Sequence, residues 1–137
     1  MNRVVHFEIH ASKPEKLANF YQDVFGWEIN EWEIPGVELA DEDRYWLVGT
    51  GEDGEPGIDG GLMLRQGDKP VDGQAVNAYV CVLDTKNIDG ALEKVRQAGG
   101  RVTVPKMPVQ GVGWAAYCKD PDGNIFGLMQ EDESAAG

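Results

Sequence analysis

The order of expected strands and helices occurs twice along this 137-residue chain, and this repeat constrains the fold more than any other feature. In the first half, a strand over residues 4–10 precedes a helix whose apolar residues recur at spacings of three and four: Leu17, Phe20, Tyr21, Val24 and Phe25. Three short strands follow, near 27–32, 44–48 and 60–65. The second half has the same order, with a strand over 75–83, a helix marked by Ile88, Ala91, Leu92 and Val95, and strands near 101–104, 113–119 and 124–130. Each half therefore predicts a βαβββ module.

A lone βαβββ module leaves one face of its sheet uncovered, and two modules solve this by pairing. We therefore expect an α+β fold of two paired βαβββ modules, whose curved mixed sheets enclose a cleft. The modules span about 1–66 and 74–131 of a single domain, with a junction at Gln66–Gly73 that is polar and punctuated by glycine and proline. We expect residues 132–137 to be an acidic flexible tail.

Local signals mark where elements begin and turn. Ser12 and Glu15 have the spacing of a capping box, which predicts a helix start there, and Gly26 predicts its end. Asp120-Pro-Asp-Gly-Asn124 predicts a bulged hairpin turn, because proline presets φ and Gly123 can adopt the left-handed conformation. Pairing of Asp120 near Asn124 would place Tyr117 opposite Gly127, with Trp114 on the other face.

Composition excludes several classes of function. The formal net charge of −12 disfavours nucleic acid and acidic membrane surfaces as partners. No segment approaches the roughly 20 apolar residues that cross a bilayer, and the N-terminus lacks a signal peptide, so we expect a cytoplasmic protein. Cys81 and Cys118 have no metal-binding spacing, which favours buried free thiols. The chain also has no nucleophile elbow and no phosphate-binding loop.

Strand alternation separates two faces of the first strand. Val5, Phe7 and Ile9 form an apolar face, so the polar residues His6, Glu8 and His10 point the other way, into the expected cleft. His10 lies about 13 Å along a straight strand from His6, too far for both to bind one ion.

The module order, the Phe20–Gly26 helix end, the Ala98–Gly100 helix exit and the Asp120–Asn124 turn together resemble the vicinal oxygen chelate superfamily. That superfamily includes glyoxalases, extradiol dioxygenases and bleomycin-resistance proteins, and the resemblance covers Val4 to Gln130. It implies a cleft in which four residues hold a divalent metal. The implied positions are His6, Gly61, Asn77, which a shift of 71 residues aligns with His6, and Gly127.

Only one of these four positions carries a metal donor of the expected kind, whereas a catalytic metal needs about three. We therefore expect a cleft that binds a small organic molecule, with no cofactor. The expected ligand-binding residues are His6, Glu8, Gly61, Asn77, Tyr117 and Gly127, in which the glycines enlarge the space. The resemblance also implies a homodimer.

Two alternatives stay open from the sequence. One is a divalent-metal-dependent lyase, isomerase or dioxygenase that uses His6, with Asp59 as a possible second donor. The other is a module that only mediates protein association. The sequence does not decide whether the chain is an enzyme, and it leaves the catalytic residues and the ligand unidentified.

Overall fold

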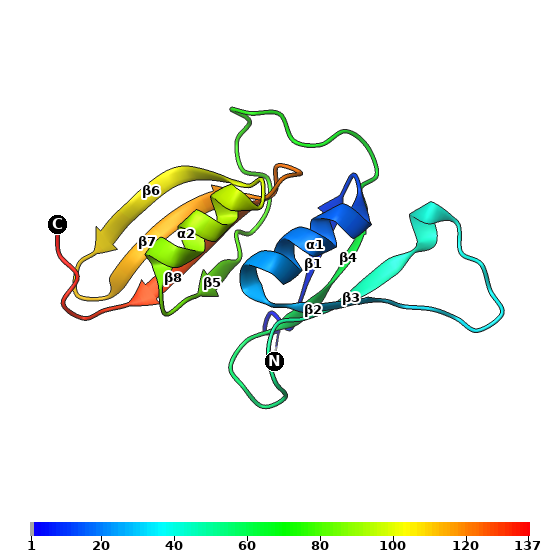
Figure 1. Ribbon diagram of the computed structural model, residues 1–137, viewed down its shortest axis with the longest axis horizontal. Coiled ribbons are helices and arrows are strands. Elements are labelled where there is room, and N and C mark those ends of the chain that lie inside the picture. The colour runs from blue at the N-terminus through cyan, green and yellow to red at the C-terminus, as the bar shows by residue number, and fades with distance from the viewer. Residues whose placement is uncertain (1) are drawn as a thin grey trace. The chain divides into compact units, whose positions relative to one another are not determined.

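The structure is a computed structural model that describes residues 2–137. It divides into two compact units, one reaching to Lys69 and the other beginning at Pro70. Each unit contains one helix and a four-stranded mixed sheet, in the chain order βαβββ (Figure 1). The predicted α+β class and the two βαβββ modules are therefore confirmed.

The sheet of the first unit has the order β1-β4-β3-β2. Its strands are β1 (His6–Ala11), β2 (Glu28–Glu31), β3 (Tyr45–Gly49) and β4 (Asp59–Leu64). β1 and β4 are parallel, whereas β3 is antiparallel to both β4 and β2. The central strand β4 therefore lies between β1 and β3, so side chains from both can meet above it.

Helix α1 (Pro14–Phe25) covers one face of this sheet. Its apolar stripe is buried against alternate residues of the strands, among them Ile29, Trp46, Val48 and Leu62. Trp27 extends this core by stacking on Tyr21, with ring centroids 5.0 Å apart and planes inclined by 5°. Because successive strand residues point to opposite faces, the residues between the buried ones face away from α1.

The start of α1 differs from the predicted capping box. The helix begins at Pro14, with Lys13 at the N-cap position and no side-chain cap. The Glu15 carboxylate instead accepts a hydrogen bond of 2.9 Å from the Arg44 guanidinium. This bond pairs the Glu15 carboxylate with a positive charge, and Pro14 already presets the helical φ.

The sheet of the second unit has the order β5-β8-β7-β6. It consists of β5 (Val82–Asp84), β6 (Arg101–Val109), β7 (Gly113–Lys119) and β8 (Ile125–Glu131), and is covered by α2 (Ile88–Gln97). Ile88, Leu92 and Val95 of α2 are buried, as are Ala116, Cys118, Phe126 and Leu128 of the sheet. Asn87 caps α2 by accepting a hydrogen bond of 3.0 Å from the Gly90 amide.

The predicted strand over 75–83 is wrong at its beginning, because β5 starts only at Val82. Val82 pairs with Gly127 in parallel register, so an extension back to Asn77 would lie beside Asp122. Asp122 belongs to the turn before β8 and offers no strand edge for pairing. The residues preceding β5 are therefore irregular, and Asn77 is exposed outside any strand.

The turn itself forms in the predicted register, with Asp120 N–H donating to the Asn124 carbonyl and Tyr117 opposite Gly127. The Asp120 carboxylate is buried and accepts hydrogen bonds from the backbone amides of Asp122 and Asn124.

The segment 132–137, which we expected to be a flexible tail, contacts the rest of the second unit at two of its residues. Trp114 donates to Asp132, and Ala135 is buried.

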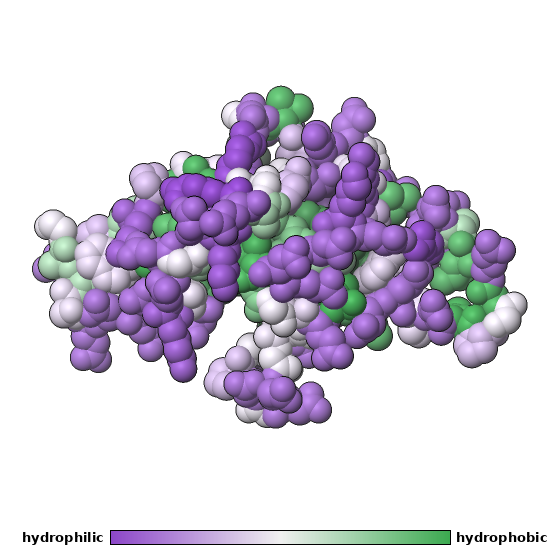
Figure 2. All heavy atoms as spheres, viewed as in Figure 1, coloured by the Kyte–Doolittle hydropathy of each residue, from purple (hydrophilic) through white to green (hydrophobic). Residues whose placement is uncertain are grey.

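Hydrophilic side chains cover most of the surface visible in Figure 2. This agrees with the acidic composition, in which 24 Asp and Glu side chains outnumber 12 Lys and Arg. Among residues 2–137, neither helix is long and apolar enough to cross a membrane.

Candidate functional site

The face of the first sheet that α1 does not cover carries a cluster of polar side chains. His6 and Glu8 lie on this face, as strand alternation predicted, and they are joined by Tyr45 from β3. The side chains of His6 and Glu8 are 49% and 46% exposed, and His6 Nε2 lies 3.9 Å from Glu8 Oε2. The cluster is therefore open to a dissolved molecule.

Tyr45 reaches this cluster by crossing the central strand at Gly61. Its hydroxyl oxygen lies 2.9 Å from His6 Nε2, a hydrogen bond that links β3 to β1 across β4. A Cβ built on Gly61 would overlap the Tyr45 hydroxyl oxygen and ring. We expected Gly61 to enlarge an empty space, and this expectation is wrong. The phenol of Tyr45 occupies the volume that a side chain at position 61 would need.

The environment of Tyr45 keeps its hydroxyl protonated. Burial raises the pKa of Tyr45, and the negative charge of Glu8 and its action as a hydrogen-bond acceptor raise it further. The hydroxyl is thus a neutral group that donates one hydrogen bond and accepts others. It is available to hold His6 in place.

Asp59, the possible second metal donor, pairs in register with His6 but is engaged elsewhere. Its carboxylate accepts from the Thr50 backbone amide at 2.8 Å and from the Thr50 hydroxyl at 3.3 Å. Within the described part of the chain, no three His, Cys, Asp or Glu side chains come together in an arrangement that could hold a metal ion.

In the second sheet a tyrosine also lies against a glycine, although Tyr117 pairs directly with its glycine whereas Tyr45 pairs with Met63 and reaches Gly61 diagonally. Tyr117 of β7 lies opposite Gly127 of β8, and a Cβ built on Gly127 would lie 3.1 Å both from the Tyr117 ring and from Val82. Val82 takes the place beside Gly127 that Glu8 takes beside Gly61. The tyrosine of the second sheet therefore has an aliphatic neighbour where Tyr45 has a carboxylate.

The pairing of Glu8 with Gly61 and of Val82 with Gly127 changes which residue of the second half corresponds to His6. Because Glu8 corresponds to Val82, the residue that corresponds to His6 is Val80, rather than Asn77. The structure brings His6, Glu8 and Gly61 together on the first sheet, and Tyr117 and Gly127 on the second. Asn77 lies in the irregular segment before β5.

Sequence reasoning missed Tyr45. The run Gly-Leu-Met occurs at Gly61 and again at Gly127, and in both halves a tyrosine lies on the strand immediately before it. This literal repeat was a signal that could have placed Tyr45 over Gly61 by analogy with Tyr117 over Gly127.

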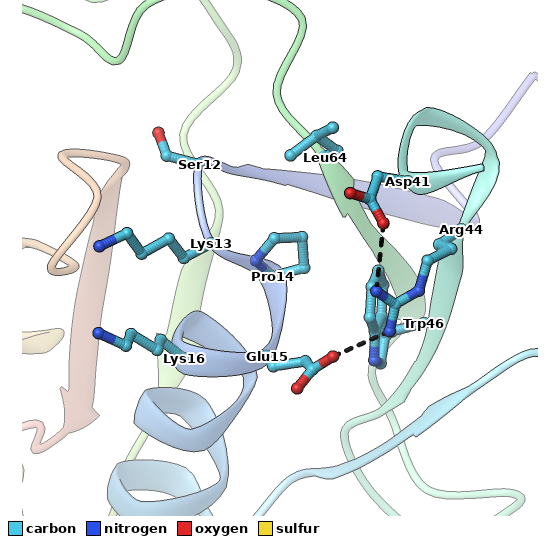
Figure 3. A pocket seen from close by; sticks show the side chains of 9 residues that line it. All are labelled: Ser12, Lys13, Pro14, Glu15, Lys16, Asp41, Arg44, Trp46 and Leu64. Atoms are coloured by element: carbon cyan, nitrogen blue, oxygen red, sulfur yellow. Dashed lines mark hydrogen bonds and ion pairs between the residues drawn. The ribbon is translucent and has the colours of Figure 1, made fainter.

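A shallow pocket of about 250 Å³ lies on the opposite, helix-covered side of the first sheet. Figure 3 shows Glu15 and Asp41 pointing toward Arg44 beside Trp46, while Lys13 and Lys16 extend away. The guanidinium bonds Glu15 and Glu31 and lies 4.8 Å from the centroid of the Trp46 ring. Because its charge is already matched by carboxylates, we interpret this pocket as a structural ion-pair network.

Comparison with known proteins identifies relatives of this chain. The model of the Glyoxalase/Bleomycin resistance protein/Dioxygenase superfamily matches residues 3–128. A lactoylglutathione lyase of Escherichia coli O157:H7 is 30% identical over 139 aligned residues, covering 98% of this chain and 97% of the relative. A probable lactoylglutathione lyase of Vibrio parahaemolyticus is 26% identical, covering 98% of this chain and 95% of the relative.

Among solved structures, maize glyoxalase I is similar in fold, with a TM-score of 0.71 at 19% sequence identity. The alignment covers 94% of this chain but only 44% of the maize chain. At that identity the likeness concerns the fold alone.

Proposed function

The chain belongs to the Glyoxalase/Bleomycin resistance protein/Dioxygenase superfamily, and on this premise we propose that it binds a small organic molecule without a divalent metal. The binding surface is the uncovered face of the first sheet, where His6, Glu8 and Tyr45 are the polar contacts. We extend the proposal to Tyr117 and Gly127 on the corresponding face of the second sheet.

The observation that carries this proposal is the position of Tyr45. A metal site at His6 would need about two further donors, and the implied positions 61 and 127 are glycines. The Tyr45 phenol occupies the space over Gly61, and its hydroxyl bonds the Nε2 atom of His6. The donor set therefore does not fit a resident catalytic metal, whereas it offers hydrogen bonds to an organic ligand.

Metal analysis tests this proposal directly. Protein purified without chelator is dialysed against Zn²⁺ or Ni²⁺, passed through a desalting column, and its metal content is measured for the wild type and His6→Ala. We expect substoichiometric metal in both. One ion per chain in the wild type that is lost in His6→Ala would overturn the proposal.

The second candidate is a divalent-metal-dependent lyase, which is favoured by the names of the Escherichia coli and Vibrio relatives. It requires the stoichiometric ion described above, together with lactoylglutathione lyase activity that follows the metal content. An isomerase or dioxygenase that uses His6 would need the same ion. Activity in the metal-loaded wild type, and its absence in His6→Ala, would replace our proposal with this one.

We also propose that the chain forms a homodimer and that it is located in the cytoplasm. Sedimentation velocity at several protein concentrations checks the assembly, with a mass of twice the 15.0 kDa chain as the expected outcome. A single species at the monomer mass over the whole range would contradict it.

A further inference from the structure

We infer that the Glu8, His6 and Tyr45 cluster selects ligands that bring a hydrogen-bond donor, such as an amine or a hydroxyl group, on a small apolar body. This inference rests on the proposed function and adds to it the chemical class of the ligand.

The cluster has few protons to donate. A neutral histidine has one N–H, a tyrosine has one O–H, and an ionised carboxylate has none. The bond of 2.9 Å between Tyr45 and His6 uses one of these two protons, whichever group donates it. At most one donated proton then remains for Glu8 or for a ligand.

The cluster is richer in hydrogen-bond acceptors. The Glu8 carboxylate has two oxygens with roughly four lone-pair directions, and Tyr45 can fill only one of them. Because its side chain is 46% exposed, the remaining directions are accessible from the open face. Acceptors therefore outnumber donors in the cluster, so the ligand group that complements it must donate.

Apolar side chains lie beside the cluster on the same face of the sheet. Leu47 of β3 pairs with Gly61 on the same face and is 52% exposed, and Met63 next to Tyr45 is half-buried. These side chains offer an apolar surface beside the polar cluster. The net charge of −12 adds a long-range preference for a donor that is also a cation.

Four ligands that share one phenyl ring test this inference. Benzyl alcohol and benzyl methyl ether are both neutral and contain an oxygen, but only the alcohol donates a proton. Benzylamine and benzoate form a charged pair, in which the amine is a cationic donor and the carboxylate only accepts. Binding to the ¹⁵N-labelled wild-type chain is followed by amide chemical shifts of β1, β3 and β4.

We expect the alcohol to bind more tightly than the ether, and benzylamine to bind roughly tenfold more tightly than benzoate, as one charge-assisted hydrogen bond would give. In Glu8→Gln most of this tenfold preference should be lost, which leaves only the small part that the net charge of the chain contributes. The matched control is Glu33→Gln, which removes one negative charge from an exposed residue outside the cluster and should keep the preference. The control separates a local acceptor from the general field of the acidic chain.

The outcomes separate this inference from the proposed function. Benzoate or the ether binding this face as tightly as its donor partner would overturn the inference and leave the binding function standing. An amine preference that is undiminished in Glu8→Gln would also overturn it, because Glu8 would not be the acceptor. Shifts for none of the four ligands at millimolar concentration would overturn both, as would a stoichiometric metal on His6.

Discussion

The phenol of Tyr45 fills the space into which a side chain at position 61 would project from β4. This relationship makes the two positions interdependent, since a larger residue at 61 requires the tyrosine to leave. It also explains why the strand at the centre of the first sheet carries a glycine there, although glycine weakens strands.

We expect Gly61→Ala to lower the free energy of unfolding by about 1–3 kcal/mol, because the new methyl group displaces Tyr45 from its bond with His6. In a Tyr45→Ala background the same substitution should cost much less, since the obstructing phenol is absent. Urea unfolding of the two single variants and the double variant gives the coupling energy. Equal costs of Gly61→Ala in both backgrounds would contradict the interdependence.

Gly127→Ala is the natural comparison, because the nearest atoms would lie at 3.1 Å and the methyl group needs only a small shift of Tyr117 or Val82. We expect a smaller loss than at position 61. A larger loss would show that the second sheet is the less tolerant one.

The two tyrosines differ in how well the sequence predicts their positions. Tyr117 could be placed opposite Gly127 because a five-residue turn, with a proline and a glycine at defined positions, fixes the register between β7 and β8. Tyr45 could not be placed in this way. Nine residues separate β3 from β4, and a loop of that length does not fix a register.

The predicted beginning of the strand over 75–83 was wrong for a related reason. Alternation over residues 75–83 describes only the segment itself, whereas a strand also needs a partner edge, and the turn at Asp120–Asn124 removes that edge. At the start of α1, the Glu15 side chain expected in the capping box bonds Arg44 instead, which lies 29 residues further along the chain. Both errors come from contacts that are distant in sequence.

The ion-pair network around Arg44 leads to a second prediction. The guanidinium bonds both oxygens of Glu31, at 2.7 and 3.2 Å, and also Glu15 at 2.9 Å, so it joins the residue just before β3 to β2 and α1. These bonds raise the pKa of Arg44, and the Arg44 hydrogen bond lowers the pKa of Glu31. We expect Arg44→Lys to lower Tm by several degrees, because lysine lacks the planar fork, and Arg44→Ala to lower it further.

Arg96→Ala is the control for this prediction. Arg96 is 55% exposed and pairs with Glu93 at 3.8 Å on the surface of α2, where ion pairs contribute little. Differential scanning calorimetry should show no measurable change in Tm for this variant. A fall equal to that of Arg44→Ala would mean that loss of positive charge, rather than the network, lowers stability.

The two cysteines should differ sharply in reactivity. Cys81 is exposed, so the expectation of a buried thiol is wrong for this residue. Cys118 is buried as expected, and burial raises its pKa to about 11. At neutral pH its thiolate population is about a hundredfold lower than at the ordinary value of 9.0. Iodoacetamide followed by peptide mass spectrometry should therefore modify Cys81 in the folded protein and Cys118 only after unfolding. Modification of both at equal rates under native conditions would contradict the burial.

The raised pKa of Cys118 also has a consequence for stability. A thiol that holds its proton more tightly when folded stabilises the fold fully below its unfolded pKa, near 9, and loses this contribution as the pH rises toward 11. We expect Cys118→Ala to remove this part of the alkaline decline in stability. An unchanged pH profile between 9 and 11 would show that other groups cause the decline.

Asp72 gives the corresponding prediction at acidic pH. Its carboxylate bonds the Arg101 guanidinium at 2.7 and 3.1 Å and lies 3.5 Å from Lys119, so it ties the segment before β5 to β6 and β7. These interactions lower the pKa of Asp72 from 3.8 to about 2, and the hydrogen bonds from Arg101 contribute most to this shift. A carboxylate whose pKa is lower in the folded state stabilises the fold above the unfolded value, near 4, and loses this contribution as the pH falls toward 2.

Asp72→Asn should therefore reduce the stability of the protein at pH 7, and the difference from the wild type should shrink as the pH approaches 2. The control is Asp53→Asn, which removes the same charge from an exposed residue in the loop between β3 and β4. Urea unfolding at several pH values measures both variants against the wild type. The ion pairs are exposed, so solvent screens them and the loss should decrease further in high salt. A deficit of Asp72→Asn that stays constant between pH 7 and 2 would show that the carboxylate acts through its shape rather than its charge.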